Sequence, residues 1–410
     1  TSGGSITVTL DDNAGVDDDL IVNGRNTLNA ADVLISSTTG DITFNVGDDA
    51  LVNGDITVSG ATRRVTFNMD PSAGDAETGS VANDGATLTI SSDPDFPNDV
   101  STITTNSAGN VNAGTFINGG NQNDIFNFAP QSTTDFVVNG NPPDFGDADV
   151  PPGDILNLDL VNVTRGNAIL NIGDPLVGDD ASAGFFTFQA PETEQTVSFT
   201  SIETVSAVDS LNPATEADYH LVVDLGIVGP NAAGASTDGY QDGTADTVDI
   251  RLNAAGSGDV EVRIDDGGGA VQVYAGQNDQ ILSLTVIGTS DDETVVLTEV
   301  ATHGLPSFST LDEDAGASIA LAAPAIDNSA TGNNINGGIS QGAHLGSAFE
   351  THIDREPVMD ANGALDIESD HVTLHFDGGA GADALQFDFV TAHDVSYFSD
   401  LADSGNSGNI

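Results

Sequence analysis

The sequence predicts an all-β protein, built from β-solenoid-like coils, from tandem β-sandwich modules, or from both. Apolar and polar residues alternate with period two in short β-branched runs, which is typical of strands with one buried face. Clusters of Gly, Asn, Asp and Ser separate these runs roughly every 8 to 15 residues. Helical periodicity is almost absent from the chain.

The predicted strands follow this alternation from the N-terminus onward. The first, between Thr1 and Leu10, alternates Ile, Val and Leu with Thr and Ser from residue 5 to residue 10. The clearest later runs share the same pattern and occupy residues 41–46, 55–58, 65–67, 86–90, 259–264 and 372–376. Glycine-rich and proline-rich breaks divide them into four expected β modules, at residues 1–115, 116–210, 211–305 and 306–410.

Composition excludes several classes of protein. The 410 residues carry 64 acidic and 7 basic side chains, and all seven basic residues are Arg. A net charge of -57 repels phosphate, so nucleic-acid binding is not expected. Disulfides and thiolate metal sites need Cys, and the chain has none. No apolar run approaches the length of a membrane span.

The acidic residues are mostly aspartate, with 12 Glu against 52 Asp. A short carboxylate suits turns, and together with backbone carbonyls it suits hard cations such as Ca²⁺. Salt adaptation is the alternative explanation for the acidity, but it does not by itself explain the preference for Asp over Glu.

The strongest calcium-binding motif is GGAGADAL, which begins at Gly378 and is preceded by Asp377. Its glycines allow backbone carbonyls to turn inward, its Asp supplies a carboxylate, and Leu385 anchors the following strand. The expected calcium ligands are Asp377, Gly379, Gly381 and Asp383. A second copy, GGNQNDIF, has Gln122 in place of the third glycine and offers Gly120, Asn121, Asn123 and Asp124.

These two motifs resemble the haemolysin-type (RTX) calcium-binding repeats of secreted bacterial proteins. The resemblance implies parallel β-turns with calcium held between adjacent turns. The two copies here are single and roughly 260 residues apart, whereas the family carries them in tandem. The alternative is a β-turn with an Asp cap. Two further Asp-rich loops are weaker calcium candidates, with Asp11, Asn13 and Asp17 in one and Asp360, Asn362 and Asp366 in the other.

Residues 116–205 are also similar to modules of very large bacterial surface and matrix proteins, in phrases such as Asn118-Gly119 and Asn139-Gly140, each followed by an Asp-Ile pair. This resemblance implies an extracellular structural role. We therefore expect a calcium-stabilised protein that assembles with itself, through addition of the strand within residues 1–10 to a neighbouring subunit.

Two other functions stay open at this stage. A calcium-dependent adhesin that binds an extracellular polysaccharide is the first alternative. A β-helix polysaccharide lyase is the second, and it would need an arginine such as Arg165, Arg251 or Arg263 beside calcium. Catalysis finds little support, because the chain lacks the usual hydrolase and nucleotide-binding motifs.

Overall fold

The all-β expectation is confirmed by a computed structural model, in which the described residues form 29 strands. All seven of the runs singled out above contain a strand. The structure describes residues 4–10, 19–22, 34–47, 49–60, 62–69, 86–93, 96–100, 102–105, 113–120, 123–141, 154–164, 166–172, 183–202, 204–208, 219–225, 245–252, 259–265, 270–277, 280–288, 293–299, 348–354, 371–377, 384–388 and 394–399.

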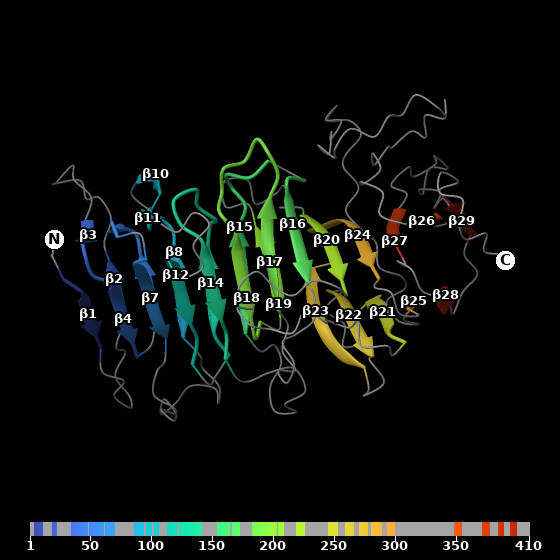
Figure 1. The fold of residues 1–410 in the computed structure, drawn as a ribbon, viewed down its shortest axis with the longest axis horizontal. Coiled ribbons are helices and arrows are strands. Elements are labelled where there is room, and N and C mark those ends of the chain that lie inside the picture. The colour runs from blue at the N-terminus through green and yellow to red at the C-terminus, as the bar shows by residue number, and fades with distance from the viewer. Residues whose placement is uncertain are drawn as a thin grey trace, which may run out of the picture.

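Most strands belong to two large sheets that run along the long axis of the molecule (Figure 1). The 13-stranded sheet has the order β1 (Ile6–Thr9), β4 (Ile42–Val46), β7 (Arg64–Met69), β12 (Gly114–Asn118), β14 (Phe136–Asn139), β18 (Val197–Thr200), β17 (Gly184–Phe188), β16 (Ala168–Ile172), β20 (Tyr219–Asp224), β24 (Ile281–Ile287), β27 (His371–Asp377), β26 (Ala348–Asp354) and β29 (Asp394–Ser399).

The 11-stranded sheet has the order β2 (Leu20–Val22), β5 (Ala50–Val52), β8 (Thr87–Ile90), β13 (Ile125–Phe128), β15 (Ile155–Asp159), β19 (Thr204–Val208), β23 (Val271–Gln277), β22 (Asp259–Asp265), β21 (Thr247–Leu252), β25 (Thr294–Thr298) and β28 (Ala384–Asp388). Two small sheets complete the described strands: β11 (Ile103–Thr104), β6 (Asp55–Val58) and β3 (Leu34–Ser37) in one, and β10 (Phe96–Val100) with β9 (Ser92–Asp93) in the other.

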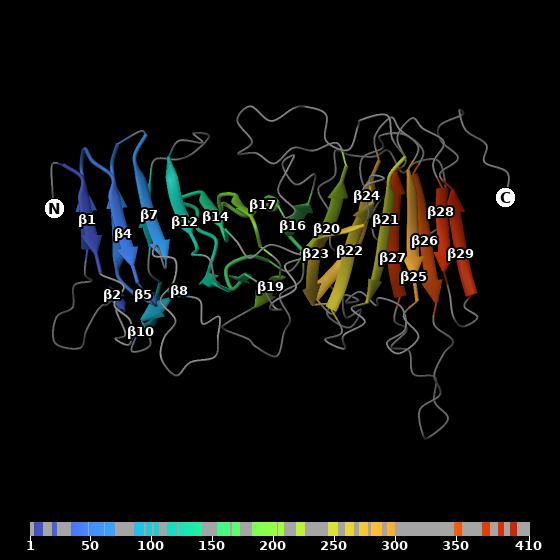
Figure 2. The ribbon, with the colours of Figure 1, turned by 90° about the horizontal axis from the view of Figure 1, so that it is seen from below.

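The chain passes repeatedly from the 13-stranded sheet to the 11-stranded sheet, and we call each such passage a coil. β4 leads to β5 and β7 leads to β8, and the strands of successive coils pair in parallel, β4 with β7 and β5 with β8. The N- and C-termini lie at opposite ends of the stack (Figures 1 and 2). Parallel pairing in register explains why neighbouring strands such as β4 and β7 share the same alternation, because each buries the same face as its neighbour.

An antiparallel insertion interrupts the parallel order in the middle of each large sheet, and β26 adds a further antiparallel strand near the end of the 13-stranded sheet. In the 13-stranded sheet, β17 lies antiparallel between β18 and β16. In the 11-stranded sheet, β22 lies antiparallel between β23 and β21. In the 13-stranded sheet, three strands lie between β18 and β24. In the 11-stranded sheet, three strands lie between β19 and β25. Each sheet therefore gains the same number of strands at its insertion.

The core lies between the two large sheets and forms one continuous apolar cluster from Leu20 to Leu374. Aromatic rings stack along and across it. Phe44 and Phe67 of neighbouring coils have ring centroids 5.0 Å apart, and Phe128 and Phe136 join the two sheets at 4.4 Å. Both large sheets contain strands from all four expected modules, and β12 spans the boundary expected at residues 115 and 116.

A polar ladder runs along the outward face of the 13-stranded sheet. Asn68 donates Nδ2–H to Asn45 Oδ1 at 2.7 Å, and Asn118 donates Nδ2–H to Asn68 Oδ1 at 2.9 Å. Asn45 in turn donates to Thr9 Oγ1 at 3.1 Å. Because equivalent side chains in neighbouring coils bond to one another, the ladder favours the observed register over a slip by one residue. Within the part of the chain that the structure describes, no helix has the length and apolar character to cross a membrane.

Candidate functional site

An acidic residue directly precedes eight of the 11 strands in the 11-stranded sheet. We call these residues the acidic column: Asp19, Asp49, Asp124, Asp154, Glu203, Asp246, Glu293 and Asp383. The six described members lie where the chain enters this sheet. Residues 203 and 383 lie outside the described residues. Neighbouring strands are only about 4.8 Å apart, so adjacent members of such a column repel unless donors or cations compensate their charge.

Asp124 shows how amide donors provide that compensation. Its side chain is fully buried, with 0% exposure. Oδ1 accepts the backbone N–H of Ala86 at 2.8 Å, and Oδ2 accepts the N–H of Gly120 at 2.6 Å. Ala86 precedes β8 in the preceding coil, so this carboxylate ties two coils together. Both oxygens of Asp124 therefore have amide donors without any metal.

Asp154 repeats the arrangement one coil further along. Its Oδ1 accepts the backbone N–H of Asp124 at 2.6 Å, and the side chain is again fully buried. The Asn-Gly phrases singled out in the sequence also stack, because Asn118 pairs with Asn139 and Ile125 pairs with Ile155. The phrase that suggested repeated modules thus marks neighbouring coils of one stack.

The positions beside these carboxylates, Gly119 and Gly140, have no space for a side chain. A Cβ added at Gly119 would collide with the Asp124 carboxylate and with the carbonyl oxygen of Gly140. A Cβ added at Gly140 would collide in the same way with the Asp154 carboxylate and with the carbonyl oxygen of Ser201. The glycines therefore allow the backbones of successive coils to approach each other closely at this corner.

Replacing Gly140 by alanine is expected to lower the free energy of unfolding by about 3 kcal/mol, because a backbone carbonyl cannot move aside as a side chain can. Denaturant titration measures the change. Gly60→Ala is the matched control, since a Cβ there meets only the flexible side chain of Arg63. Equal stabilities of the two variants would contradict this account of the corner.

Other aspartates also accept an amide from the next coil. Asp41 Oδ1 accepts the N–H of Arg64 at 3.1 Å, and Asp55 Oδ1 accepts that of Thr102 at 3.0 Å. Asp49, a member of the acidic column, accepts the N–H of Thr87 at 2.8 Å. A carboxylate one methylene from the backbone reaches the amide beside it, which gives a physical reason for the preference for Asp over Glu.

Glu192 is a longer carboxylate that also caps a turn. Its Oε1 accepts the N–H of Thr164 at 3.0 Å and the side-chain amide of Asn167 at 2.8 Å. Burial raises the pKa of Glu192, but the hydrogen bonds from Thr164 and Asn167 outweigh it and lower the pKa overall.

A second part of the acidic column lies in the later coils. Asp246 is 1% exposed and Glu293 is 0% exposed, and they directly precede the paired strands β21 and β25. The N–H of Thr294 donates to the carbonyl of Asp246 at 2.8 Å, so the two backbones are adjacent. Asp383 precedes β28, the next strand in this sheet. Three consecutive strands are thus each preceded by an acidic residue.

Most of the calcium ligands expected from the sequence lie outside the described residues. These are Gly379, Gly381, Asp383, Asn121, Asp11, Asn13, Asp17, Asp360, Asn362 and Asp366. Asp377 is the last residue of β27. Gly120 and Asp124 meet in the amide-capped turn described above, next to Asn123 in the chain. Among the described residues, no three His, Asp or Glu side chains gather closely enough to hold a metal ion.

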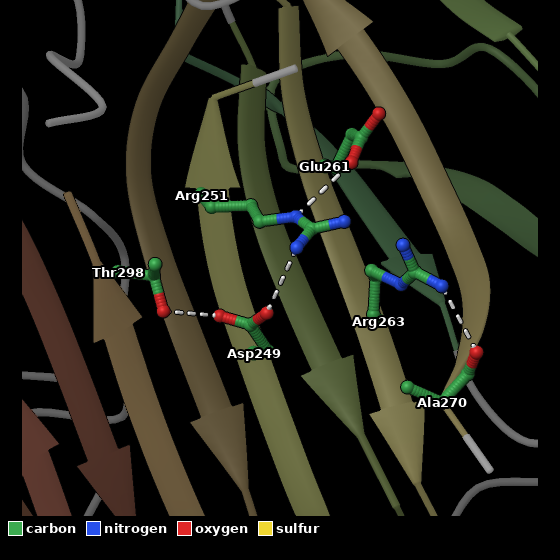
Figure 3. Close-up of polar contacts among 6 residues, drawn as sticks. All are labelled: Asp249, Arg251, Glu261, Arg263, Ala270 and Thr298. Carbon is green, nitrogen blue, oxygen red and sulfur yellow. Dashed lines mark hydrogen bonds and ion pairs between the residues drawn. The ribbon is translucent and has the colours of Figure 1, made fainter. Parts of the chain in front are cut away.

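Arg251 lies in a network of ion pairs on the outward side of the 11-stranded sheet (Figure 3). Its Nε donates to Glu261 Oε2 at 3.3 Å, and its Nη1 lies 3.6 Å from Asp249 Oδ2. Asp249 also accepts the hydroxyl of Thr298 at 2.6 Å. Arg251 is thus shared between two carboxylates, which favours a structural role over the arginine of a lyase. Arg263 donates Nη2–H to the carbonyl of Ala270 at 3.1 Å, and Arg165 lies outside the described residues.

His220 and Ser283 form a buried polar pair between β20 and β24. His220 Nδ1 lies 2.7 Å from Ser283 Oγ, and the histidine is 8% exposed. Burial lowers the pKa of His220, and a backbone hydrogen bond with Gly166 opposes this only in part. The lowered pKa favours the neutral imidazole, which is the form that is less costly to bury between two strands.

In comparisons with known proteins, no protein-family model, curated protein sequence or solved structure matches this chain.

The acidic column was only partly visible in the sequence. In the sequence, glycine-rich phrases mark Asp124 and Asp383, whereas Glu203 and Glu293 follow no such phrase. The signal that marks Glu203 and Glu293 is an acidic residue directly before a short β-branched run.

Proposed function

We propose that this chain is an extracellular structural protein that assembles with itself into a fibre, a surface layer or a matrix. The observation that carries the proposal is the continuity of the two large sheets from one end of the described chain to the other. Each added coil extends the stack along one axis, and the one apolar cluster follows that axis. Such an architecture suits load-bearing or spacing better than it suits the enclosure of a substrate.

We further propose that calcium stabilises the fold at the later part of the acidic column. Asp246 and Glu293 are buried, and they directly precede the paired strands β21 and β25, so two acidic residues lie at the same edge of the sheet. In the sequence, Asp383 directly precedes β28, the strand next to β25 in the sheet, and it belongs to the motif that resembles RTX repeats. Carboxylate oxygens with backbone carbonyls are the ligands that Ca²⁺ prefers. When bound, calcium would supply positive charge between coils that carry like charge.

A calcium-dependent adhesin that binds a neutral extracellular polysaccharide is the second candidate. The outward ladder of Asn45, Asn68 and Asn118 supports it, because each side-chain amide keeps a further donor and acceptor beyond those used within the ladder. The lyase alternative has less support, since Arg251 is engaged by Asp249 and Glu261. We accordingly propose that the chain has no catalytic activity.

Electron microscopy of the purified chain tests the structural role. In calcium we expect linear or sheet-like polymers, and after chelation we expect dispersed particles. Calcium would reduce the repulsion between chains of net charge -57. A chain that stays monomeric at every calcium concentration, yet is retained on an immobilised polysaccharide, would favour the adhesin instead.

A further inference from the structure

Among the described strands, none pairs with the outer edge of the first or the last strand of the 13-stranded sheet. β1 and β29 each have one strand neighbour, β4 and β26 respectively, among the strands that the structure describes. They lie at opposite ends of the long axis (Figures 1 and 2). The edge backbone of such a strand carries unpaired N–H and C=O groups that can bond to another chain.

The two open strands run in the same direction. Between β1 and β29 the sheet contains four antiparallel junctions, β18 with β17, β17 with β16, β27 with β26, and β26 with β29. Every other junction in this sheet is parallel. An even number of reversals restores the original direction, so β29 is parallel to β1.

The 11-stranded sheet obeys the same rule. Its two antiparallel junctions, β23 with β22 and β22 with β21, leave β28 parallel to β2. At the C-terminal end the 13-stranded sheet reaches two strands further, through β26 and β29. β29 is therefore the described strand that a neighbouring molecule would meet first at this end.

The hydrogen-bonding groups of β1 are arranged for such a contact. The N–H groups of Ile6 and Leu10 donate to Asp41 and Asn45, each at 2.9 Å. Successive residues of a strand point their amides to alternate sides, so the N–H groups of Thr7 and Thr9 face away from β4. Both threonines are exposed.

The first coil also carries exposed apolar side chains. Ile21 on β2 is 58% exposed and Leu34 on β3 is 56% exposed, and they are the exposed large apolar residues among those that the structure describes. These two side chains lie on different strands of the first coil, at the end of the stack where β1 lies.

We infer that a second copy of this chain pairs its β29 with β1, in parallel, and that repetition of this contact builds a polar filament. The inference rests on the proposed self-assembly and names the surfaces that carry it. The contact joins β29 of one copy to β1 of the next, so the two surfaces differ and the contact is heterologous. Successive subunits are then related largely by translation along the stack. A contact of this type does not close and therefore continues. Each added subunit extends the 13-stranded sheet without reversing its direction.

Engineered cysteines test the contact directly, because the chain has no Cys of its own. The double variant Thr7→Cys/Ser396→Cys places one thiol on β1 and one on β29. In calcium, a flexible bis-maleimide should convert it into a ladder of covalent oligomers. Each single variant should remain monomeric on a denaturing gel, and an equal mixture of the two should yield dimers and nothing larger.

The outcomes separate this contact from the proposed assembly. Dimers from Thr7→Cys alone would show that β1 pairs with β1, and would overturn the inference. Filaments in the microscope without a cross-linked ladder would overturn the β29–β1 contact while leaving self-assembly intact. Absence of both would overturn the proposed function as well.

A proline variant supplies an independent test that leaves the fold in place. Thr7→Pro removes an outward N–H and no hydrogen bond to β4, and proline is tolerated on edge strands when its nitrogen faces outward. Thr7→Ala removes the same side chain but keeps the amide. We expect at least a tenfold higher critical concentration for filaments of Thr7→Pro than of Thr7→Ala, with equal melting temperatures. Equal assembly by the two variants would contradict the inference.

Discussion

Replacing Asp124 by alanine should lower the free energy of unfolding by about 3 to 5 kcal/mol, since hydrogen bonds to a charged group contribute about 1.5 to 3 kcal/mol each. The variant leaves the N–H groups of Ala86 and Gly120 without their acceptor in a buried turn. The bond from Ala86 is one of those that tie the coil of β13 to the coil of β8. Chemical denaturation followed by circular dichroism measures the loss.

Asp388→Ala is the control for this experiment. Asp388 ends β28 with an exposed side chain, so its replacement removes the same charge from the surface. Its effect should stay within about 0.5 kcal/mol. If the two variants lose similar stability, the amide cap at Asp124 contributes little and net charge dominates.

Removing calcium should lower the melting temperature by about ten degrees or more in low-salt buffer. One ion present at about 100 times its dissociation constant contributes about 2.7 kcal/mol by mass action, so a shift of this size needs more than one ion. Thermal melts with calcium and with EDTA measure it. An unchanged curve would contradict a stabilising role for calcium.

Two controls distinguish specific calcium binding from general charge screening. If sodium chloride restores the melting temperature as well as calcium does, general screening explains the acidity and salt adaptation is favoured. Asp383→Ala removes one expected ligand and should reduce the calcium stoichiometry by about one ion per chain. The same stoichiometry in variant and parent would show that GGAGADAL is only a turn.

The strands could be predicted from the sequence because their cause is local. Residues 41–46 alternate, and β4 has a buried residue at every second position. The same holds for β7 and β21. The order of strands in the sheets could not be predicted, because it depends on which distant run supplies the neighbour. β26 precedes β27 in the chain yet lies beyond it in the sheet, and no local pattern marks that reversal.

The carboxylate corners were recognisable only in part for a related reason. Gly119, Gly120 and Asp124 lie close together in the sequence, and their spacing drew attention to the turn. One amide donor to the Asp124 carboxylate is Ala86, which is 38 residues away from it in the sequence. Gln280 is a further example, since it bonds to both backbone groups of Ala207 from 73 residues away. Such partners become visible only when the coils are stacked.

The matched insertions around β17 and β22 have a consequence for how such a chain can change its length. A single extra strand in one layer would reverse the direction of every strand after it and leave the facing layer one strand short. An added pair of antiparallel strands preserves direction, but it keeps the layers level only when the opposite layer gains a pair as well. Within the stack, a duplication or deletion that keeps the two layers level must therefore comprise whole coils or balanced pairs of antiparallel strands. An unbalanced pair such as β26 and β29 lies at the end of the sheet, where no further described coil follows it.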